Sequence, residues 1–142
     1  MSNEEIVYRL VKMDYVVQSE DGEWHPTKDA FRGRDRRISV DRAAKCNYDP
    51  SYTQKGIDPV CRLRVGEVRS IDIGPKFDSK GRIIDKYEAC VEATPQPCND
   101  AHADIYAYPE RASDRAWKIL REGLAAIYEW EEGFAPTSRE GV

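Results

Sequence analysis

The chain has 142 residues, a formal net charge of −4, 34% charged residues and 40% hydrophobic residues. This length suits one domain with its own core, and this composition is that of a folded globular protein rather than a disordered one. The negative charge argues against a general nucleic-acid coat protein, although it leaves room for a local basic patch.

No stretch reaches the length of a membrane span, and the acidic opening at 2–5 is unlike the basic, apolar start of a signal peptide. We therefore expect a cytoplasmic protein with no membrane partner. Four cysteines are too sparse for a disulfide scaffold, so reduced thiols are expected. They are Cys46, Cys61, Cys90 and Cys98.

The first half of the chain predicts short strands separated by polar loops. Residues 5–11 are apolar on both faces, which predicts a central strand with Arg9 as its odd member. Residues 15–17 predict a short strand that ends in the turn at 20–22. Residues 60–65 alternate between apolar and charged side chains, which predicts a strand with one buried face.

Other segments are less regular. Asp41 is expected to cap a helical turn over 42–45. Residues 68–73 predict a strand, the turn at 78–81 follows it, and residues 83–93 are expected to pair back as a hairpin.

Residues 101–108 alternate with the period of a strand. Its small and apolar side chains fall on one face, where they would fit under a helix. The other face carries His102, Asp104, Tyr106 and Tyr108.

Residues 114–132 predict one long helix, with Ser113 as N-cap and Gly133 as its C-terminal stop. Its apolar residues form a broad stripe suited to a sheet rather than a narrow coiled-coil seam. We therefore expect a single α+β domain over residues 1–133, followed by a tail at 134–142. Its sheet is mostly antiparallel, with about five or six strands and the C-terminal helix packed across one face.

His102 and Asp104 are the candidate catalytic pair. A carboxylate beside a histidine orients the ring and favours its protonated form, as general acid–base catalysis requires. The alternative is an ordinary solvated sheet face, on which such residues are common. Ser39 and three cysteines (Cys46, Cys90 and Cys98) are possible nucleophiles, but none lies in a recognisable nucleophile motif.

Arginines 32–37 form the strongest local charge feature, and they could bind phosphate through their paired donors. The alternative is a solvated loop whose charges pair with nearby acids. If Arg9 and the turn at Asp41 and Arg42 converge with the catalytic pair on the open sheet face, opposite the helix, they would complete a site for an anionic ligand. The candidate ligand-binding residues are Arg9, Arg34, Arg36, Arg37, Asp41, Arg42 and Tyr106.

No metal and no cofactor are predicted. Cys98 and His102 lack the short paired spacing of structural zinc sites, and the chain has no glycine-rich nucleotide motif. The sequence favours a small domain that binds an anionic or phosphate-bearing ligand, such as a nucleic-acid fragment, with possible phosphodiester chemistry at His102. The alternative is a non-catalytic protein-interaction module, favoured if Trp24, Tyr106 and Tyr108 form one exposed patch.

Overall fold

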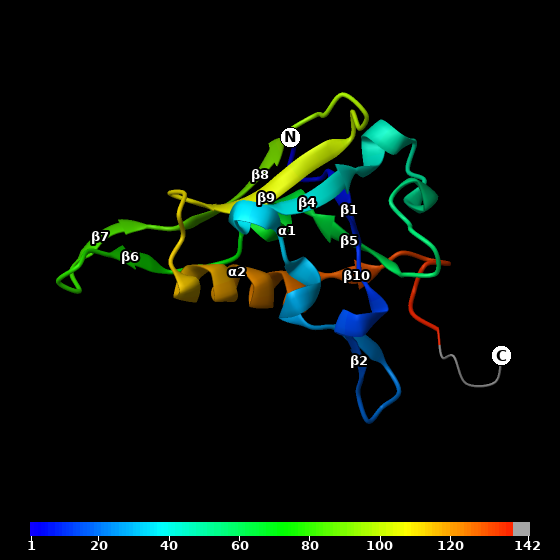
Figure 1. Cartoon of the computed structure of the whole chain (residues 1–142), viewed down its shortest axis with the longest axis horizontal. Helices are drawn as coiled ribbons and strands as arrows, with labels where there is room; N and C mark the ends of the chain where they lie inside the picture. The colour runs from blue at the N-terminus through cyan, green and yellow to red at the C-terminus, as the bar shows by residue number, and fades with distance from the viewer. Residues whose placement is uncertain (138–142) are drawn as a thin grey trace.

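A six-stranded antiparallel sheet forms the centre of the fold, in the order β10-β5-β1-β4-β9-β8. The computed structural model describes residues 1–137, so residues 138–142 of the predicted tail lie outside the described residues. The strands are β1 (Ile6–Leu10), β4 (Ile38–Arg42), β5 (Val60–Arg64), β8 (Glu88–Ala93), β9 (His102–Tyr108) and β10 (Glu129–Trp130). The long helix α2 (Asp114–Ile127) lies across one face (Figure 1). The predicted α+β architecture is confirmed.

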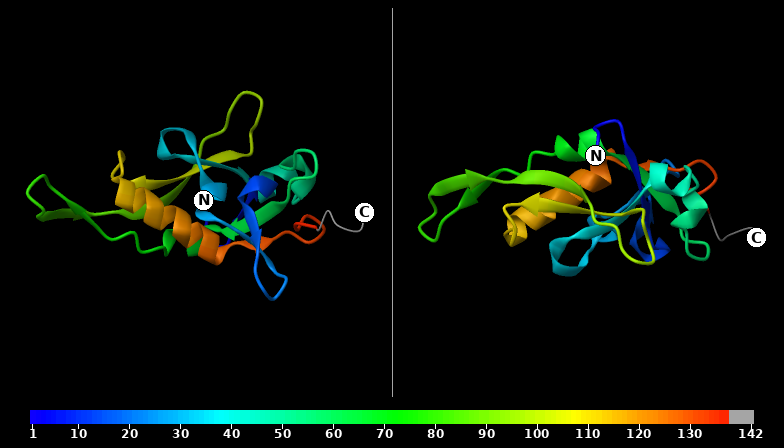
Figure 2. Two further views of the ribbon diagram at one scale, coloured as in Figure 1. Left: turned by 60° about the horizontal axis from the view of Figure 1, so that its bottom comes forward. Right: turned by 90° about the horizontal axis from the view of Figure 1, so that it is seen from above.

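Two hairpins extend from this body (Figures 1 and 2). One joins β2 (Val16–Gln18) to β3 (Trp24–Pro26), and the other joins β6 (Pro75–Phe77) to β7 (Ile83–Lys86). Short helices connect the strands. They are α1 (Val65–Arg69) and the 3-10 helices η1 (Met13–Tyr15), η2 (Lys28–Phe31), η3 (Arg34–Arg36), η4 (Ala43–Cys46) and η5 (Pro50–Tyr52). No helix within residues 1–137 has the length and apolar character needed to cross a membrane.

The main core lies between the sheet and α2. Leu120 and Leu124 of α2 are fully buried and belong to the same apolar cluster as Ala103 and Ile105 of β9. The small side chains of β9 let the helix approach closely, as its alternation predicts. The hydroxyl of Ser113 accepts a hydrogen bond from the Ala116 amide at 3.1 Å, which confirms the predicted N-cap.

A second cluster covers the opposite face of β1. Tyr8 packs there with Ala43, Cys46 and Val60, and Phe134 packs against them. Because Val7 faces the main core and Tyr8 faces this second cluster, both faces of β1 are buried. This confirms the central position predicted for the strand.

The strand predicted over 68–73 is wrong. The chain instead turns through α1, whose two buried valines, Val65 and Val68, are three residues apart. That spacing puts both on one side of a helical turn, facing the core. The helix contacts β8, and so connects the end of β5 to the far edge of the sheet.

The hairpin expected over 83–93 is also divided differently. Buried Tyr87 separates β7 from β8. β7 pairs with β6, whereas β8 pairs with β9 over its whole length. Side chains alternate along β8, with Ala89 and Val91 facing the core.

The predicted helix over 114–132 ends at Ile127, so Gly133 is not its stop. Tyr128 is extended, and Glu129 and Trp130 pair with β5 as strand β10. The Nε1 of Trp130 donates to the carbonyl of Trp24 at 2.9 Å. Covering the free edge of β5 therefore outweighs the helical periodicity of the sequence.

Leu120→Ala should lower the free energy of unfolding by about 2 to 5 kcal/mol, because it leaves a cavity between α2 and the sheet. Urea denaturation of both proteins measures this loss. The exposed Lys118→Ala change on the same helix should stay within about 0.5 kcal/mol of the unchanged protein. Equal losses in the two variants would contradict this account of the core.

Burial of Tyr8, together with the nearby Glu131 carboxylate, raises the pKa of its phenol from 10.0 to about 12. The folded state therefore holds this proton more tightly than the unfolded state does. The resulting stability is fully present below pH 10 and is lost as the pH rises through about 12. In the Tyr8→Phe variant, the free energy of unfolding should therefore fall less steeply with pH over this range. Urea denaturation at a series of pH values measures the slope, and an equal slope in both proteins would contradict the role assigned to Tyr8.

Candidate functional site

The candidate catalytic residues lie on the sheet face opposite α2. His102 and Asp104 alternate along β9 with Ala103 and Ile105, which face the core. Strand β4 pairs with β9 so that Ser39 lies opposite Asp104 and Asp41 lies opposite His102. These four polar side chains therefore share one face.

His102 is 9% exposed, and both of its ring nitrogens have partners. Nδ1 lies 3.1 Å from the carbonyl oxygen of Thr94 and 2.9 Å from its hydroxyl. Nε2 lies 3.2 Å from the Ser39 hydroxyl and 3.8 Å from Oδ1 of Asp104. Thr94 thus holds the ring, a function that the sequence had suggested for Asp104.

Arg37 connects the acids of this face. Its guanidinium binds Asp104 at 3.1 Å and Glu110 at 2.6 Å, and it lies 4.1 Å from the centre of the Tyr106 ring. The hydrogen bond to Glu110, with a further one to Asp104, raises the pKa of Arg37. Burial, followed by a hydrogen bond to Glu92, raises the pKa of Tyr106. This network positions Asp104 and leaves Arg37 little capacity for an added anion.

The other predicted arginines do not converge. Arg36 binds the carbonyl of Ala112 and the carboxylate of Asp114 at the start of α2. Arg42 binds Glu5 at 2.6 Å, so it does not reach His102. Arg34 is exposed and makes no ion pair within residues 1–137.

Arg9 begins on the face of β1 that it shares with Val7 and lies opposite Cys61 of the main core. Its half-buried guanidinium donates to three backbone carbonyls, those of Ala30 at 3.1 and 3.2 Å, Arg32 at 2.8 Å and Ser39 at 2.7 Å. Burial lowers the pKa of this guanidinium from its ordinary value. No carboxylate among the described residues pairs with it.

Asp41 does not cap a helical turn, because it lies within β4 and η4 begins after Arg42 without a side-chain cap. Its carboxylate accepts hydrogen bonds from the Thr53 hydroxyl at 2.7 Å and the Asn99 amide at 2.8 Å. Tyr52 in turn donates to Asn99 at 2.7 Å. Asp41 therefore ties two loops to the end of the sheet.

Two neighbouring hollows have Arg9 and Leu10 in common, and each measures about 460 Å³. The first, called here the histidine hollow, is lined by Arg9, Leu10, Ser39, Val40, Asp41, Tyr52, Thr53, Lys55, Cys98, Asn99 and His102. The second, called the basic hollow, is lined by Arg9, Leu10, Lys12, Tyr15, Asp29, Ala30, Arg32, Gly33 and Arg34. Both have a volume typical of small-molecule sites.

Gly33 lets the chain close around the basic hollow. A Cβ atom at this position would lie 1.7 Å from the carbonyl oxygen of Arg37, so no larger residue fits without moving the backbone. The glycine therefore allows residues 32–37, called here the arginine loop, to fold back on themselves.

Sequence reasoning did not single out Lys12, Lys55, Thr53 or Thr94. Strand alternation alone places Ser39 and Asp41 on one face, but only the register with β9 brings Ser39 to His102. Thr94 reaches the imidazole because the chain turns back between β8 and β9, and the sequence between them carries no signal for that contact.

The cysteines are unpaired in the structure. Burial raises the pKa of the Cys46 and Cys90 thiols, and complete burial raises that of Cys61 to about 12. A raised pKa leaves little thiolate at neutral pH, so these three thiols are poor nucleophiles.

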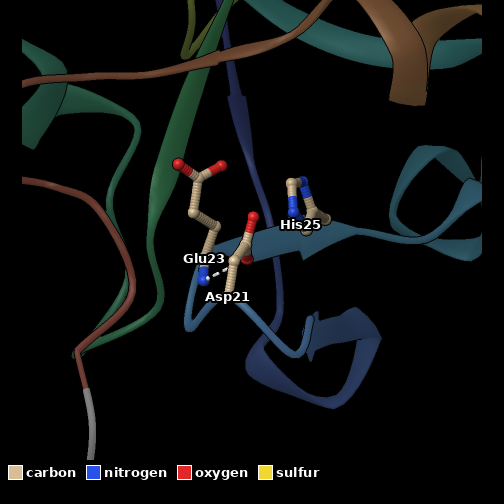
Figure 3. Close-up of side chains that lie close together, drawn as sticks. All are labelled: Asp21, Glu23 and His25. Atoms are coloured by element: carbon tan, nitrogen blue, oxygen red, sulfur yellow. Dashed lines mark hydrogen bonds between the residues drawn. The ribbon is translucent and has the colours of Figure 1, made fainter.

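Asp21, Glu23 and His25 gather on the β2–β3 hairpin, with one ligand atom from each within 4.8 Å of the others (Figure 3). Nδ1 of His25 lies 2.9 Å from the Tyr128 hydroxyl, and Nε2 lies 3.2 Å from the Ser19 hydroxyl. Because both ring nitrogens already have partners and both carboxylates are exposed, we assign no metal to this cluster.

Comparison of the chain with protein-family models, with curated proteins and with solved structures finds no match in any of the three.

Arg9→Lys should lower the free energy of unfolding by about 1.5 to 3 kcal/mol, because a single ammonium cannot reach all the carbonyls that the guanidinium binds. Arg34→Lys, at an exposed position without an ion pair, should change it by less than about 0.5 kcal/mol. Chemical denaturation measures both. If Arg9→Lys leaves the free energy of unfolding unchanged, these hydrogen bonds do not have the structural role assigned to them.

Proposed function

We propose that the histidine hollow and the basic hollow together bind a phosphate-bearing anion, such as a nucleotide or a nucleic-acid fragment. The observation that carries the proposal is the guanidinium of Arg9, which borders both hollows and is paired with carbonyl oxygens rather than with a carboxylate. Its positive charge is therefore not neutralised by a neighbouring acid, and a bound anion would neutralise it.

The charges around Arg9 support this proposal. Lys12, Arg32 and Arg34 line the basic hollow, and none of them pairs with a carboxylate in the described part of the chain. The acid of that hollow, Asp29, lies 3.4 Å from Arg121. Guanidinium groups that are not already paired suit phosphate oxygens, which they bind with two parallel donors.

The histidine hollow favours the same kind of ligand. Arg9 and Lys55 both line it, so two cations outnumber its one acid, Asp41, whose oxygens accept hydrogen bonds from Thr53 and Asn99. His102 also lines this hollow, and its ring lies beside the exposed Ser39 hydroxyl, a group that can hydrogen-bond to phosphate oxygens. An extended anion could thus contact the arginine loop at one end and His102 at the other.

Lys12→Gln and Arg34→Gln should each weaken binding of pyrophosphate and of a short single-stranded oligonucleotide by roughly fivefold, because each removes one exposed charge contact. Isothermal titration calorimetry measures the affinities. Raising the salt concentration from about 50 to about 200 mM should weaken oligonucleotide binding further in the unchanged protein.

Lys45→Gln and Arg115→Gln provide matched controls, since they change the net charge equally at exposed positions outside both hollows. They should bind within about twofold of the unchanged protein. Equal weakening by all four variants, or no saturable binding by the unchanged protein, would overturn the proposal.

A protein-interaction module is the second candidate. Phe77, Ile83 and Ile84 are 48%, 68% and 57% exposed on the protruding β6–β7 hairpin, as expected for a contact surface (Figure 1). The aromatic patch that would favour this function does not form. Trp24 lies against Trp130 of β10, whereas Tyr106 and Tyr108 lie near the opposite edge of the sheet, on β9.

A further inference from the structure

Ser39 and His102 are diagonal neighbours on the open face of the β4–β9 pair. The Ser39 hydroxyl lies 3.2 Å from Nε2 of His102, within reach of a hydrogen bond. Ser39 is exposed in the histidine hollow, while the ring of His102 is buried behind it. This arrangement gives a ligand access to the serine and keeps the imidazole in one position.

The contact with Thr94 determines which nitrogen of His102 can accept a proton. Nδ1 faces both the Thr94 hydroxyl at 2.9 Å, which can donate or accept, and the Thr94 carbonyl oxygen at 3.1 Å, which can only accept. A proton on Nδ1 of the neutral ring satisfies both contacts, and we assign this tautomer to the ring. Nε2 then carries a lone pair directed at Ser39. A nucleophile beside a base that a third group orients is the general arrangement of nucleophilic catalysis.

Asp104 places a carboxylate beside the ring of His102. Its Oδ1 lies 3.8 Å from Nε2 of His102, and its Oδ2 is held by Arg37 at 3.1 Å. This carboxylate therefore lies beside the ring without occupying the nitrogen that faces Ser39. Nη1 of Arg9 also lies 2.7 Å from the Ser39 carbonyl, which brings a positive charge close to the reacting serine.

We propose that Ser39 is a nucleophile and His102 its general base, and that together they cleave a phosphodiester bound in the histidine hollow. Oγ of Ser39 forms a bond to phosphorus while the bond from phosphorus to the leaving oxygen breaks. The hydroxyl proton passes to Nε2 and then to the leaving alcohol. Water then attacks phosphorus and gives a proton to Nε2 of His102 while the bond from phosphorus to Oγ of Ser39 breaks. His102 returns the proton to Oγ, and the product phosphomonoester departs. The substrate class rests on the proposed function, whereas the reactivity of Ser39 does not.

The β2–β3 hairpin contains a natural comparison. The Ser19 hydroxyl and Nε2 of His25 are also 3.2 Å apart, but the single proton of this hydroxyl has two other acceptors within reach, the Asp21 carboxylate and the Glu23 carbonyl. Nδ1 of His25 faces a hydroxyl, which can donate or accept, so the tautomer of the ring is not determined. The same distance is therefore not expected to activate Ser19.

A fluorophosphonate probe tests the proposal directly, because its phosphorus reacts with an activated serine and releases fluoride. Intact mass and peptide mapping should show one adduct, at Ser39. His102→Asn should slow the labelling by roughly 100-fold. Ser39→Ala should abolish labelling and hydrolysis of bis(p-nitrophenyl) phosphate, while Ser19→Ala should leave both unchanged.

Absence of an adduct, an adduct at another residue, or labelling that His102→Asn does not slow would each overturn the proposal. Since the adduct is located in the unchanged protein, a folding failure of the His102→Asn variant would not prevent this decision. Pyrophosphate binding measured separately distinguishes the two proposals. Binding without labelling would overturn only the nucleophile, whereas labelling of Ser39 without pyrophosphate binding would overturn the phosphate site and support the nucleophile.

Discussion

The guanidinium of Arg9 lies where β1 and β4 separate, and the arrangement of the candidate site depends on it. The two strands pair only at Val7 and Tyr8 of β1, and beyond this point the side chain of Arg9 reaches the Ser39 carbonyl of β4. The same group binds the carbonyls of Ala30 and Arg32, and so holds the arginine loop against the sheet. One cation thus replaces backbone hydrogen bonds that the separated strands cannot make. The two hollows border this position.

Ion pairing divides the arginines of β1, of β4 and of the loop at 32–37 into two groups. Arg36, Arg37 and Arg42 bind carboxylates on the start of α2, on β9 and before β1, where they stabilise the fold. Arg9, Arg32 and Arg34 bind no carboxylate within residues 1–137 and border one hollow. A protein with a net negative charge can therefore present a local positive surface, because most of its acids are placed elsewhere.

In the proposed chemistry, the strands of the open sheet face hold the reacting groups, and the loops around the two hollows supply the other contacts. Backbone pairing between β4 and β9 sets the distance between Ser39 and His102, so rigid strands rather than loops position the reacting groups. Loops supply the remaining contacts. Thr94 follows β8 and orients the imidazole, and the arginine loop supplies positive charge beside it.

The sequence alone determined the local features of this protein. The alternation in 101–108 and 60–65 placed the correct side chains on the core face, and Ser113 marked the start of α2, because these signals depend on side chains within a few residues of each other. Only the tertiary structure decided where α2 ends, how β7 and β8 divide, and which arginines stay unpaired. Two of these depend on partners distant in sequence, β5 for β10 and Glu5 for Arg42. The division of β7 from β8 depends on their pairing with different neighbours, β6 and β9. The contact between Ser39 and His102 is of the same kind, since it follows from the register of two strands that are far apart in the chain.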